Sequence, residues 1–435
     1  MKLVQKGDTK LINAWAFYDW ANSVYSLVIT TAIFPIYYES VTNNNNGKVH
    51  FLGTDFNNAS LLSYSLSFSF LMVALLSPIL SGIADYTGNK KKFLQFFCYL
   101  GSFSVISLFF FKGQDTLWIG IVGTILASIG FWGSIVFYNS YLPEIAPPEQ
   151  HDRVSAKGFM FGYLGSLILL TFSLTMVMKP EWFGITDASL PARISFVIVG
   201  IWWMGFAQIT FYHLPNNVFN KKPQKEYIFK GFRELRVVLA SLKELKSLKQ
   251  FLTAFFLYSI GVQTVILLAG LYGKKELGID TSKLILIILL INFVAIFGAY
   301  LFSRISEKIG NISTLKITIA LWGGICVAAY FLNAKSPNID AQFYALGATI
   351  GMVLGAIQSL SRSTYSKLLP ETQEHATYFS FFDVTEKIAI VVGTFIFGFV
   401  GAITNSMRDS FFILAVFFLL GFIVLSTMQK PNSVK

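Results

Sequence analysis

Long apolar runs separated by short polar segments recur along the whole chain. Twelve of them contain roughly 18 or more residues, which is long enough for an α-helix to cross a bilayer. They lie near residues 12–37, 59–82, 93–111, 117–138, 156–178, 194–213, 251–272, 284–303, 314–333, 341–360, 379–403 and 410–427. A barrel strand has about ten alternating residues, whereas these runs are about twice as long and apolar on every face. The pattern predicts an all-α membrane protein with twelve transmembrane helices.

The composition agrees with this prediction. Hydrophobic residues make up 54% of the chain and charged residues 13%, whereas a soluble domain carries about 25% charged residues. The first apolar run is far longer than the core of a signal peptide, which has about 7–15 residues, so we expect it to remain in the mature protein. Cys98 and Cys326 lie inside apolar runs and are expected to act as small apolar residues.

The basic residues are distributed unevenly between the connecting segments. If both termini are cytoplasmic, the inner segments hold 24 of the 34 Lys and Arg residues and the outer loops hold nine. The positive-inside rule therefore predicts cytoplasmic termini. The same distribution argues against nucleic-acid binding as the reason for the net charge of +11.

Residues 214–250 form the one long polar connection. They hold nine basic residues against three Glu, and Leu235, Val238, Leu239, Leu242 and Leu245 recur at helical spacing. This pattern predicts an amphipathic helix on the membrane surface, either as an anchored linker or as a regulatory or partner-binding segment. The segment divides the chain into an N-terminal bundle of six spans, residues 1–213, and a C-terminal bundle of six spans, residues 251–435.

The two halves contain similar short segments at similar offsets. Asp85–Asn89 resembles Glu307–Asn311, 222 positions later, and Leu142–Glu144 resembles Leu369–Glu371, 227 positions later. Internal duplication of this kind indicates a transporter built from two related bundles.

A polar, glycine-containing turn follows the second span. In residues 82–92, Gly88 permits a tight reversal, Asp85 can cap a helix N-terminus, and Lys90 and Lys91 favour the cytoplasmic side. With Gly82 at its start, this segment resembles the signature loop of the major facilitator superfamily. The resemblance implies two pseudo-symmetric six-helix bundles and a loop that latches them in the outward-facing state.

A narrower resemblance rests on three segments. They are Ala16–Ser23, Phe137–Ala146 continuing from Asp152 to Gly165, and Gln358–Ser363 followed by Phe382, Asp383 and Lys387. These segments resemble the vacuole-effluxer branch of the superfamily, which is related to the autophagy-associated vacuolar permease. The resemblance implies that the best-known members export neutral amino acids from a vacuole. Because the chain has no organelle signal and, outside residues 214–250, no long loops, it looks like a bacterial relative, for which the resemblance leaves the substrate open, and we expect it in a bacterial inner membrane.

One charged residue lies inside the first span. A charge at a helix centre costs about 2.5–3.5 kcal/mol on insertion scales, so Asp19 is expected to face a cavity or a hydrogen-bonding partner. Spacings of three and four residues place a set of polar or aromatic residues on the same helical face. The set is Trp15, Asp19, Asn22, Ser26 and Thr30. Substrate cavity and structural tie are both compatible with this face.

The eleventh span contains Asp383, Glu386 and Lys387 in its first turns. At 1.5 Å per residue, Asp19 and Lys387 lie roughly 10–13 Å from the cytoplasmic start of their spans. We therefore expect Asp19 and Lys387 to form a salt bridge, unless Lys387 pairs with Asp383 at i,i+4 on its own helix. Proton coupling through Asp19 or Asp383 is an expectation, and sodium coupling and uniport also fit the sequence.

Several uncharged polar residues lie within or at the ends of spans. They are Asn139, Gln208, Gln263, Asn292 and Gln358, and each is a candidate for the substrate pathway or for a hydrogen bond between helices. Asn139 and Gln358 are expected at the inner ends of spans four and ten. Arg362 is expected at the cytoplasmic mouth, paired with Glu371 or Glu374 or with lipid headgroups. Gly158, Gly162 and Gly165 predict close helix packing on span five.

The sequence therefore predicts a secondary transporter that moves small solutes by alternating access, with neutral amino acids as the first candidate. The alternatives are proton-driven efflux of drugs or other metabolites, and a sensor or scaffold with a transporter fold. The four His residues show no metal-ligand spacing, and no nucleophile–base set is visible. We expect no enzymatic activity and no cofactor. The expected partners are a small-molecule substrate, the lipid bilayer and protons.

Overall fold

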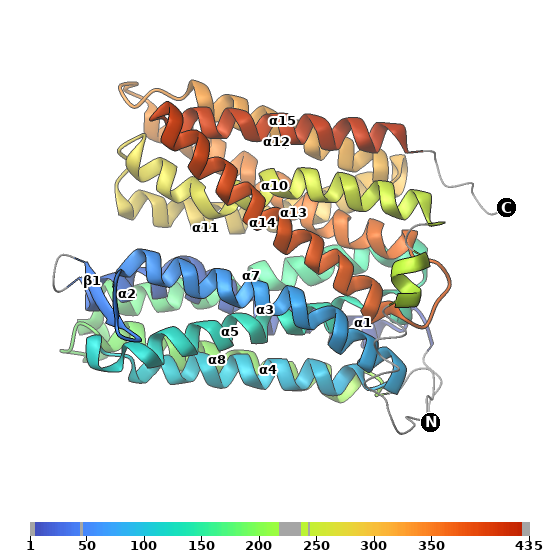
Figure 1. The fold of residues 1–435 in the computed structure, drawn as a ribbon, viewed down its shortest axis with the longest axis horizontal. Coiled ribbons are helices and arrows are strands. Elements are labelled where there is room, and N and C mark those ends of the chain that lie inside the picture. The colour runs from blue at the N-terminus through green and yellow to red at the C-terminus, as the bar shows by residue number, and fades with distance from the viewer. Residues whose placement is uncertain (1–4, 44–46, 217–235, 242–243, 429–435) are drawn as a thin grey trace. The chain divides into compact units, whose positions relative to one another are not determined.

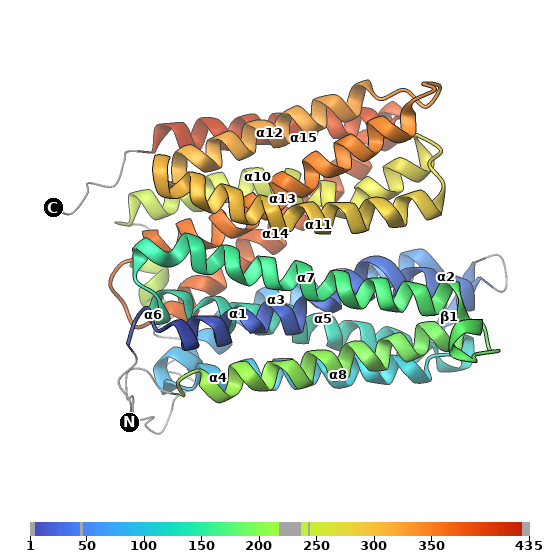
Figure 2. The same ribbon diagram turned by 180° about the vertical axis from the view of Figure 1, so that it is seen from behind.

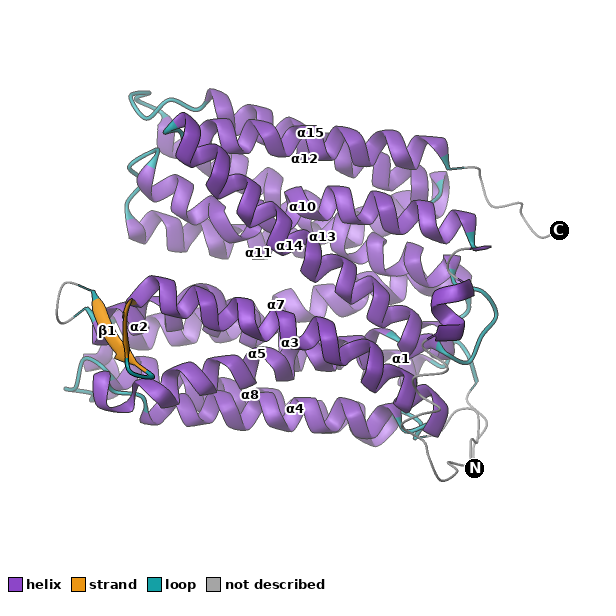
Figure 3. Cartoon of the chain, in the orientation of Figure 1, coloured by secondary structure: helices purple, strands orange, loops and turns teal. Residues whose placement is uncertain are grey.

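The computed structural model describes residues 5–43, 47–216, 236–241 and 244–428. It consists almost entirely of helices, as Figures 1 and 3 show. Twelve of the helices are long and apolar enough to cross a membrane, which confirms the all-α architecture and the number of spans. The first span joins three consecutive helical pieces, α1 (Thr9–Val24), η1 (Tyr25–Ile33) and α2 (Phe34–Thr42).

The remaining spans are single long helices. They are α3 (Asn58–Thr87), α4 (Lys90–Ser107), α5 (Leu117–Asn139), α7 (His151–Met178), α8 (Leu190–His213), α10 (Lys246–Lys275), α11 (Thr281–Ile309), α12 (Asn311–Phe331), α13 (Ile339–Leu368), α14 (His375–Thr404) and α15 (Met407–Thr427). Short helical turns are η2 (Leu108–Phe110), η3 (Gln114–Thr116), α6 (Leu142–Ile145), η4 (Pro148–Gln150) and η5 (Pro180–Phe183).

The chain forms two compact units. The first contains Met1–Tyr141 and Phe161–Gly231, and the second contains Leu142–Met160 and Phe232–Lys435. Residues 142–160, which connect two spans of the first half of the sequence, thus fold with the second unit. Most of the linker expected at 214–250 lies outside the described residues, including Leu235 and Leu242, but residues 236–241 are helical and Val238 is buried.

Each unit repeats the same pattern of helix packing. In the first unit, α1 packs on α8, α3 on α5, and α4 on both α5 and α8. In the second unit, α10 packs on α15, α11 on α13, and α12 on both α13 and α15. The order of these pairs along the sequence is the same, and Figure 2 lets the reader follow the helices from behind. The internal duplication seen in the sequence is therefore also present in the packing.

The turns that follow α3 and α11 occupy corresponding places in the two units, although Gly88 has ψ 15° and Gly310 has ψ 155°. Each helix is followed by a glycine with positive φ, Gly88 at 70° and Gly310 at 86°, a backbone conformation that favours glycine. The turn after α3 is shorter than the sequence indicated. Gly82 and Asp85 belong to the last turns of α3 and only Gly88 and Asn89 separate it from α4, so the expectation of a longer loop was wrong.

The first span changes its helical period in its middle part. Residues 25–33 form a π-helix, in which Thr31 Oγ1 donates to Ser26 O at 2.9 Å, five residues earlier. Helical π segments are rare and occur most often as single-turn bulges. A single α-helical face from Trp15 to Thr30 was therefore a wrong prediction, because the period of 3.6 ends at Val24.

Several helices are longer than their apolar runs, because their ends carry polar residues that the runs exclude. Helix α13 continues to Leu368, so Gln358 lies within it and does not end the span as we expected. By contrast, Asn139 is the last residue of α5, as predicted. The connection after the first span contains a hairpin of β1 (Lys48–Phe51) and β2 (Thr54–Asn57), shown in Figure 3.

Candidate functional site

In the first unit, a tyrosine hydroxyl on a neighbouring helix binds the carboxylate predicted from the sequence. Asp19 is 7% exposed, and its Oδ2 accepts a hydrogen bond from Tyr138 Oη at 2.8 Å. The Tyr138 ring stacks on Trp15 with centroids 4.5 Å apart, and Trp15 Nε1 donates to Tyr138 O at 2.9 Å. Helix α5 thus supplies both the donor for Asp19 and the surface on which Trp15 rests.

Asn22 follows Asp19 by one helical turn and is 1% exposed. Its Oδ1 accepts from Ser23 Oγ at 3.3 Å, while its Nδ2 has no hydrogen-bond partner among the described residues. A buried donor without a partner costs free energy. Asp19 and Asn22 therefore combine an acceptor and an unsatisfied donor on one face of α1.

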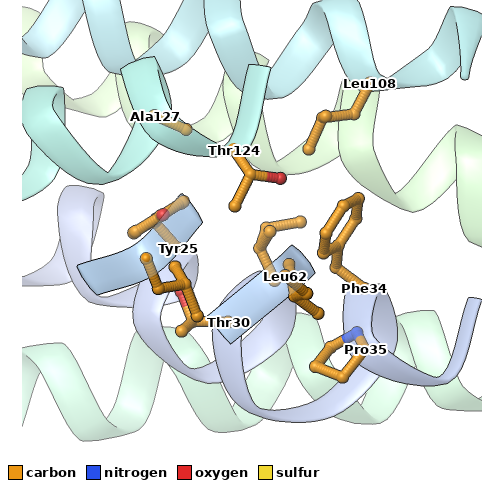
Figure 4. A pocket seen from close by; sticks show the side chains of 10 residues that line it. Tyr25, Thr30, Phe34, Pro35, Leu62, Leu108, Thr124 and Ala127 are labelled. Atoms are coloured by element: carbon orange, nitrogen blue, oxygen red, sulfur yellow. The ribbon is translucent and has the colours of Figure 1, made fainter. Parts of the chain in front are cut away.

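The other two residues of the predicted face lie in the π-helix. Ser26 Oγ donates to Ser23 O at 3.0 Å within its own helix. Thr30 lines a mainly apolar pocket, and Figure 4 shows it with Tyr25 and Thr124. Among the described contacts, neither Ser26 nor Thr30 therefore shares a hydrogen bond or this pocket with Asp19.

In the second unit, the charged residues of α14 form one cluster. Lys387 Nζ lies 2.9 Å from Asp383 Oδ1 and 3.3 Å from Glu386 Oε2. Gln263 on α10 donates from Nε2 to Glu386 Oε1 at 2.7 Å. The structure therefore pairs Lys387 with Asp383, the i,i+4 partner considered from the sequence. The pairing with Asp19, a residue of the other unit, stays a prediction.

A second cluster in this unit was missed by sequence reasoning. Asp152, 1% exposed, accepts hydrogen bonds from Lys367 Nζ at 2.8 Å, Ser306 Oγ at 2.8 Å and Asn311 Nδ2 at 2.7 Å. The neighbouring Arg153 forms an ion pair with Glu307. These contacts hold the segment 142–160 on α11, α12 and α13. The only signal in the sequence was the repeat Glu307–Asn311, whose Asn311 is one of the donors.

The segment 142–160 makes two further buried contacts. Glu144 Oε1 lies 2.9 Å from His375 Nδ1, and both side chains are buried. Arg362, 3% exposed, donates from Nε to Ser155 Oγ at 2.9 Å and from a terminal nitrogen to Ser155 O at 2.7 Å. The expectation that Arg362 contacts headgroups was wrong, because its side chain is buried in the protein. The guanidinium carbon also lies 4.2 Å from the centroid of the Phe159 ring.

The basic residues after α3 make contacts within the first unit. Lys91 Nζ donates to Leu214 O at 3.0 Å, at the end of α8, and Lys90 lies 5.2 Å from the centroid of the Tyr141 ring. Lys90 is 4% exposed and Asp85 is 2% exposed. The signature segment is therefore largely buried, and its lysines cover protein surfaces.

The uncharged polar candidates differ in their surroundings. Asn292 donates to Ile288 O of its own helix at 2.8 Å, which is a local structural contact. Gln208 contacts Tyr99 Oη at 3.2 Å, between α8 and α4. Gln358 is half-buried and Asn139 is 7% exposed. Of the glycines on α7, Gly162 and Gly165 permit close packing on α1, because a methyl group on Gly162 would lie 2.5 Å from Ser23 Oγ.

Comparison with known proteins identifies the family. The sequence profile described as "Vacuole effluxer Atg22 like" matches residues 7–435. The chain belongs to this family of major facilitator superfamily transporters. It is 31% identical over 432 residues to the "Uncharacterized MFS-type transporter YxiO" of Bacillus subtilis (strain 168), covering 99% of this chain and 97% of the relative. It is 25% identical to "Autophagy-related protein 22-1" of Penicillium rubens, covering 88% of this chain and 77% of that protein.

Solved structures of other transporters share the fold. The "Major Facilitator Superfamily (MFS) transporter, FucP, in the outward conformation" has a TM-score of 0.69 at 13% identity, over 98% of this chain and 99% of that chain. The "human organic anion transporter MFSD10 (TETRAN)" has a TM-score of 0.71 at 12% identity, over 97% and 100%. The Atg22-like chain is thus an integral, multi-pass secondary transporter with the major facilitator fold, and it belongs to a transporter family, not an enzyme family.

Proposed function

We propose that this transporter moves small neutral amino acids across a bacterial plasma membrane by alternating access, with both termini in the cytoplasm. An α-amino acid at neutral pH is a zwitterion, so a buried site must offer an acceptor to its ammonium and a donor to its carboxylate. Neutral amino acids are the first substrate class to test because the sequence resembles the vacuole-effluxer branch, and "Autophagy-related protein 22-1" is among the relatives of this chain.

The observation that carries the proposal is the pair Asp19 and Asn22 on α1. Residues three apart on a helix have Cβ atoms about 5–6 Å apart. Two side chains at this spacing can bind the ammonium and the carboxylate of the same amino acid. Asp19 supplies the acceptor, and Asn22 Nδ2 is a buried donor that no described residue satisfies. A substrate carboxylate would accept a hydrogen bond from Asn22 Nδ2, and this contact favours binding of a zwitterion.

The test is counterflow in proteoliposomes with a panel of radiolabelled amino acids. We expect exchange of one or more neutral members and little exchange of charged ones. Because a hydrogen bond to a charged group contributes about 1.5–3 kcal/mol, Asn22→Ala should lower the exchange rate at subsaturating substrate by roughly 10–100-fold. The matched control is Asn338→Ala, since Asn338 is exposed before α13 and makes no side-chain capping hydrogen bond.

The alternatives predict different results from the same vesicles. Exchange of cationic drugs or other metabolites without amino-acid exchange would favour an efflux transporter. Binding of a solute without any flux would favour a sensor or scaffold. If the Asn22→Ala protein exchanges amino acids as fast as wild type, Asn22 does not belong to the substrate site.

A further inference from the structure

The charged cluster on α14 holds one more carboxylate than ammonium groups. Asp383 and Lys387 are 3% and 1% exposed, and the side chain of Glu386 is 19% exposed. Within this unit, the charged groups that act on Asp383 are Lys387 and Glu386. From the packed helix α10, Gln263 donates to Glu386, and the phenol of Tyr258 is hydrogen-bonded to Ser361.

A net negative charge in this position is unfavourable. Burial penalises an unbalanced ion by several kcal/mol, and like charges three residues apart on a helix repel each other. One additional cation balances the cluster. The smallest such cation is a proton on one of the two carboxylates.

The hydrogen bonds distinguish the two carboxylates. Both oxygens of Glu386 accept, Oε1 from Gln263 and Oε2 from Lys387. Asp383 accepts from Lys387 on Oδ1 only, and its buried Oδ2 has no hydrogen-bond partner among the described residues. Asp383 Oδ2 is therefore the oxygen on which a proton displaces no existing hydrogen bond.

We propose that Asp383, Glu386 and Lys387 form a proton-binding switch in which protonation of Asp383 transfers the Lys387 ammonium to Glu386. A hydronium ion transfers its proton to Asp383 Oδ2, so one O–H bond of hydronium breaks, one O–H bond forms on the carboxyl group and a water molecule is left, while Lys387 remains an ammonium. Neutral Asp383 holds that ammonium less strongly, and Glu386 Oε2 is already 3.3 Å from it. Loss of the proton to water reverses the change. This inference deepens the proposed function, because it names the site through which a proton gradient acts on transport.

The switch is testable without any substrate. Infrared difference spectra of the purified wild-type protein, recorded as the pH is lowered, should contain the C=O stretch of a buried protonated carboxyl group. Asp383→Asn should abolish this band. Glu386→Gln should abolish it at the same pH, because one carboxylate then balances one ammonium and Asp383 stays ionised. The matched control Asp115→Asn, a change at an exposed residue of η3, should retain it.

Each other outcome contradicts the proposal. A wild-type spectrum with no buried carboxyl band, or a full band in Asp383→Asn, would show that Asp383 is not the proton acceptor. A full band in Glu386→Gln would show that charge balance does not control protonation. A band that sodium removes at fixed pH, relative to choline, would assign the site to a metal cation. If Asp383→Asn does not fold, the wild-type and Glu386→Gln spectra still decide.

The infrared spectra and the amino-acid counterflow test the two proposals separately, so one proposal can be contradicted while the other is supported. A buried carboxyl band without amino-acid exchange would support the switch and contradict the proposed substrate class. Exchange without the band would support the substrate class and contradict the switch.

Discussion

Three buried carboxylates, Asp19, Asp152 and Asp383, accept hydrogen bonds from different kinds of donor. Asp19 accepts from a tyrosine hydroxyl, whereas Asp152 accepts from an ammonium, a hydroxyl and an amide. Asp383 uses one of its oxygens and leaves the other unsatisfied. A buried carboxylate with many donors is typical of a structural role, and an unsatisfied one keeps the capacity to bind a proton.

The hydroxyl of Tyr138 can be removed with little change of shape. Tyr138→Phe deletes the donor to Asp19 Oδ2 and keeps the ring that stacks on Trp15. A hydrogen bond to a charged group contributes about 1.5–3 kcal/mol, so we expect lower thermal stability and slower amino-acid counterflow. The control is Tyr64→Phe, because Tyr64 is 62% exposed. Equal effects of the two changes would contradict a specific role for the hydroxyl.

The ion pair between Asp152 and Lys367 should stabilise the second unit. Asp152→Asn removes the charge that faces Lys367, whose side chain is 25% exposed. Because Lys367 is partly hydrated, we expect the free energy of unfolding to fall by about 3 kcal/mol, the lower end of the range for broken buried ion pairs. Thermal unfolding of Asp152→Asn, Lys367→Met and the double variant measures the coupling. The control is Asp280→Asn, which removes the charge from an exposed ion pair in which Asp280 Oδ2 lies 3.9 Å from Lys283 Nζ.

The double variant gives the decisive comparison. If the pair is coupled, Asp152→Asn with Lys367→Met should be less destabilised than the sum of the single changes. Additive effects would show that Ser306 and Asn311, and not the ion pair, hold Asp152.

The sequence identified Asp19 and Asp383 but not Asp152, for a physical reason. A charge inside an apolar run is recognisable from its neighbours along the chain, because insertion into lipid is costly. Asp152 lies in a polar segment where a carboxylate is unremarkable. Its partners Ser306, Asn311 and Lys367 are more than 150 positions away. Helical periodicity describes one helix at a time, so it carries no information on such contacts.

At the scale of elements, glycines determine how closely α11 and α13 approach. A methyl group on Gly355 would lie 2.1 Å from Ala295 O, and one on Gly298 would lie 2.0 Å from Met352 O. Both neighbours are backbone atoms, which cannot move without moving the helix. Small residues allow this close packing in membranes, where burial of apolar surface does not favour helix association.

Gly355→Ala is therefore expected to destabilise the second unit strongly. Overpacking costs about 1–3 kcal/mol, and more where backbone must shift, and this exceeds the gain of about 1 kcal/mol from alanine in a helix. Gly398→Ala in α14 is the matched control, since a methyl group there contacts nothing within 4 Å. Thermal unfolding should place Gly355→Ala below wild type and Gly398→Ala at or above it. The reverse order would contradict the packing described here.

The sequence predicted where the first span lies but not its π-helix. The apolar content of residues 25–33 is the same whichever helical period they adopt. The π-helix contains a local contact that hydropathy does not report, the hydrogen bond from Thr31 Oγ1 to Ser26 O. The ends of α13 were misplaced for a related reason, because hydropathy does not follow a helix beyond its apolar part.

At the scale of the whole molecule, short repeated segments were enough to indicate two related halves. The repeat around Gly88 and Gly310 lies in turns at corresponding places in the two units, and the helix pairs of each unit recur in the same order. Pseudo-symmetry of this kind arises from duplication and is a property of many transporter folds. The assignment of residues 142–160 to the second unit was not visible, because it depends on contacts such as those of Asp152 and Glu144.

The basic residues predict the orientation of the chain in the membrane, and this orientation can be measured. In a Cys98→Ala, Cys326→Ala background, Lys6→Cys is expected to resist a membrane-impermeant maleimide in intact cells, and Asn333→Cys is expected to react. Both positions are exposed in the protein, so only the membrane distinguishes them. Permeabilised cells provide the control, since both should then react. Labelling of Lys6→Cys alone in intact cells would reverse the predicted topology.

The proposed coupling between proton binding and transport is tested on the whole molecule. One pH unit corresponds to about 1.4 kcal/mol, which drives roughly tenfold accumulation for one coupled proton. Wild-type proteoliposomes with an imposed pH gradient should accumulate the exchanged amino acid, and Asp383→Asn should only equilibrate it. Counterflow should persist in Asp383→Asn, because exchange at equal concentrations requires no proton release. Asp115→Asn should accumulate as wild type does. Accumulation by Asp383→Asn would assign the proton to another carboxylate, and wild-type uptake indifferent to the gradient would contradict proton coupling altogether.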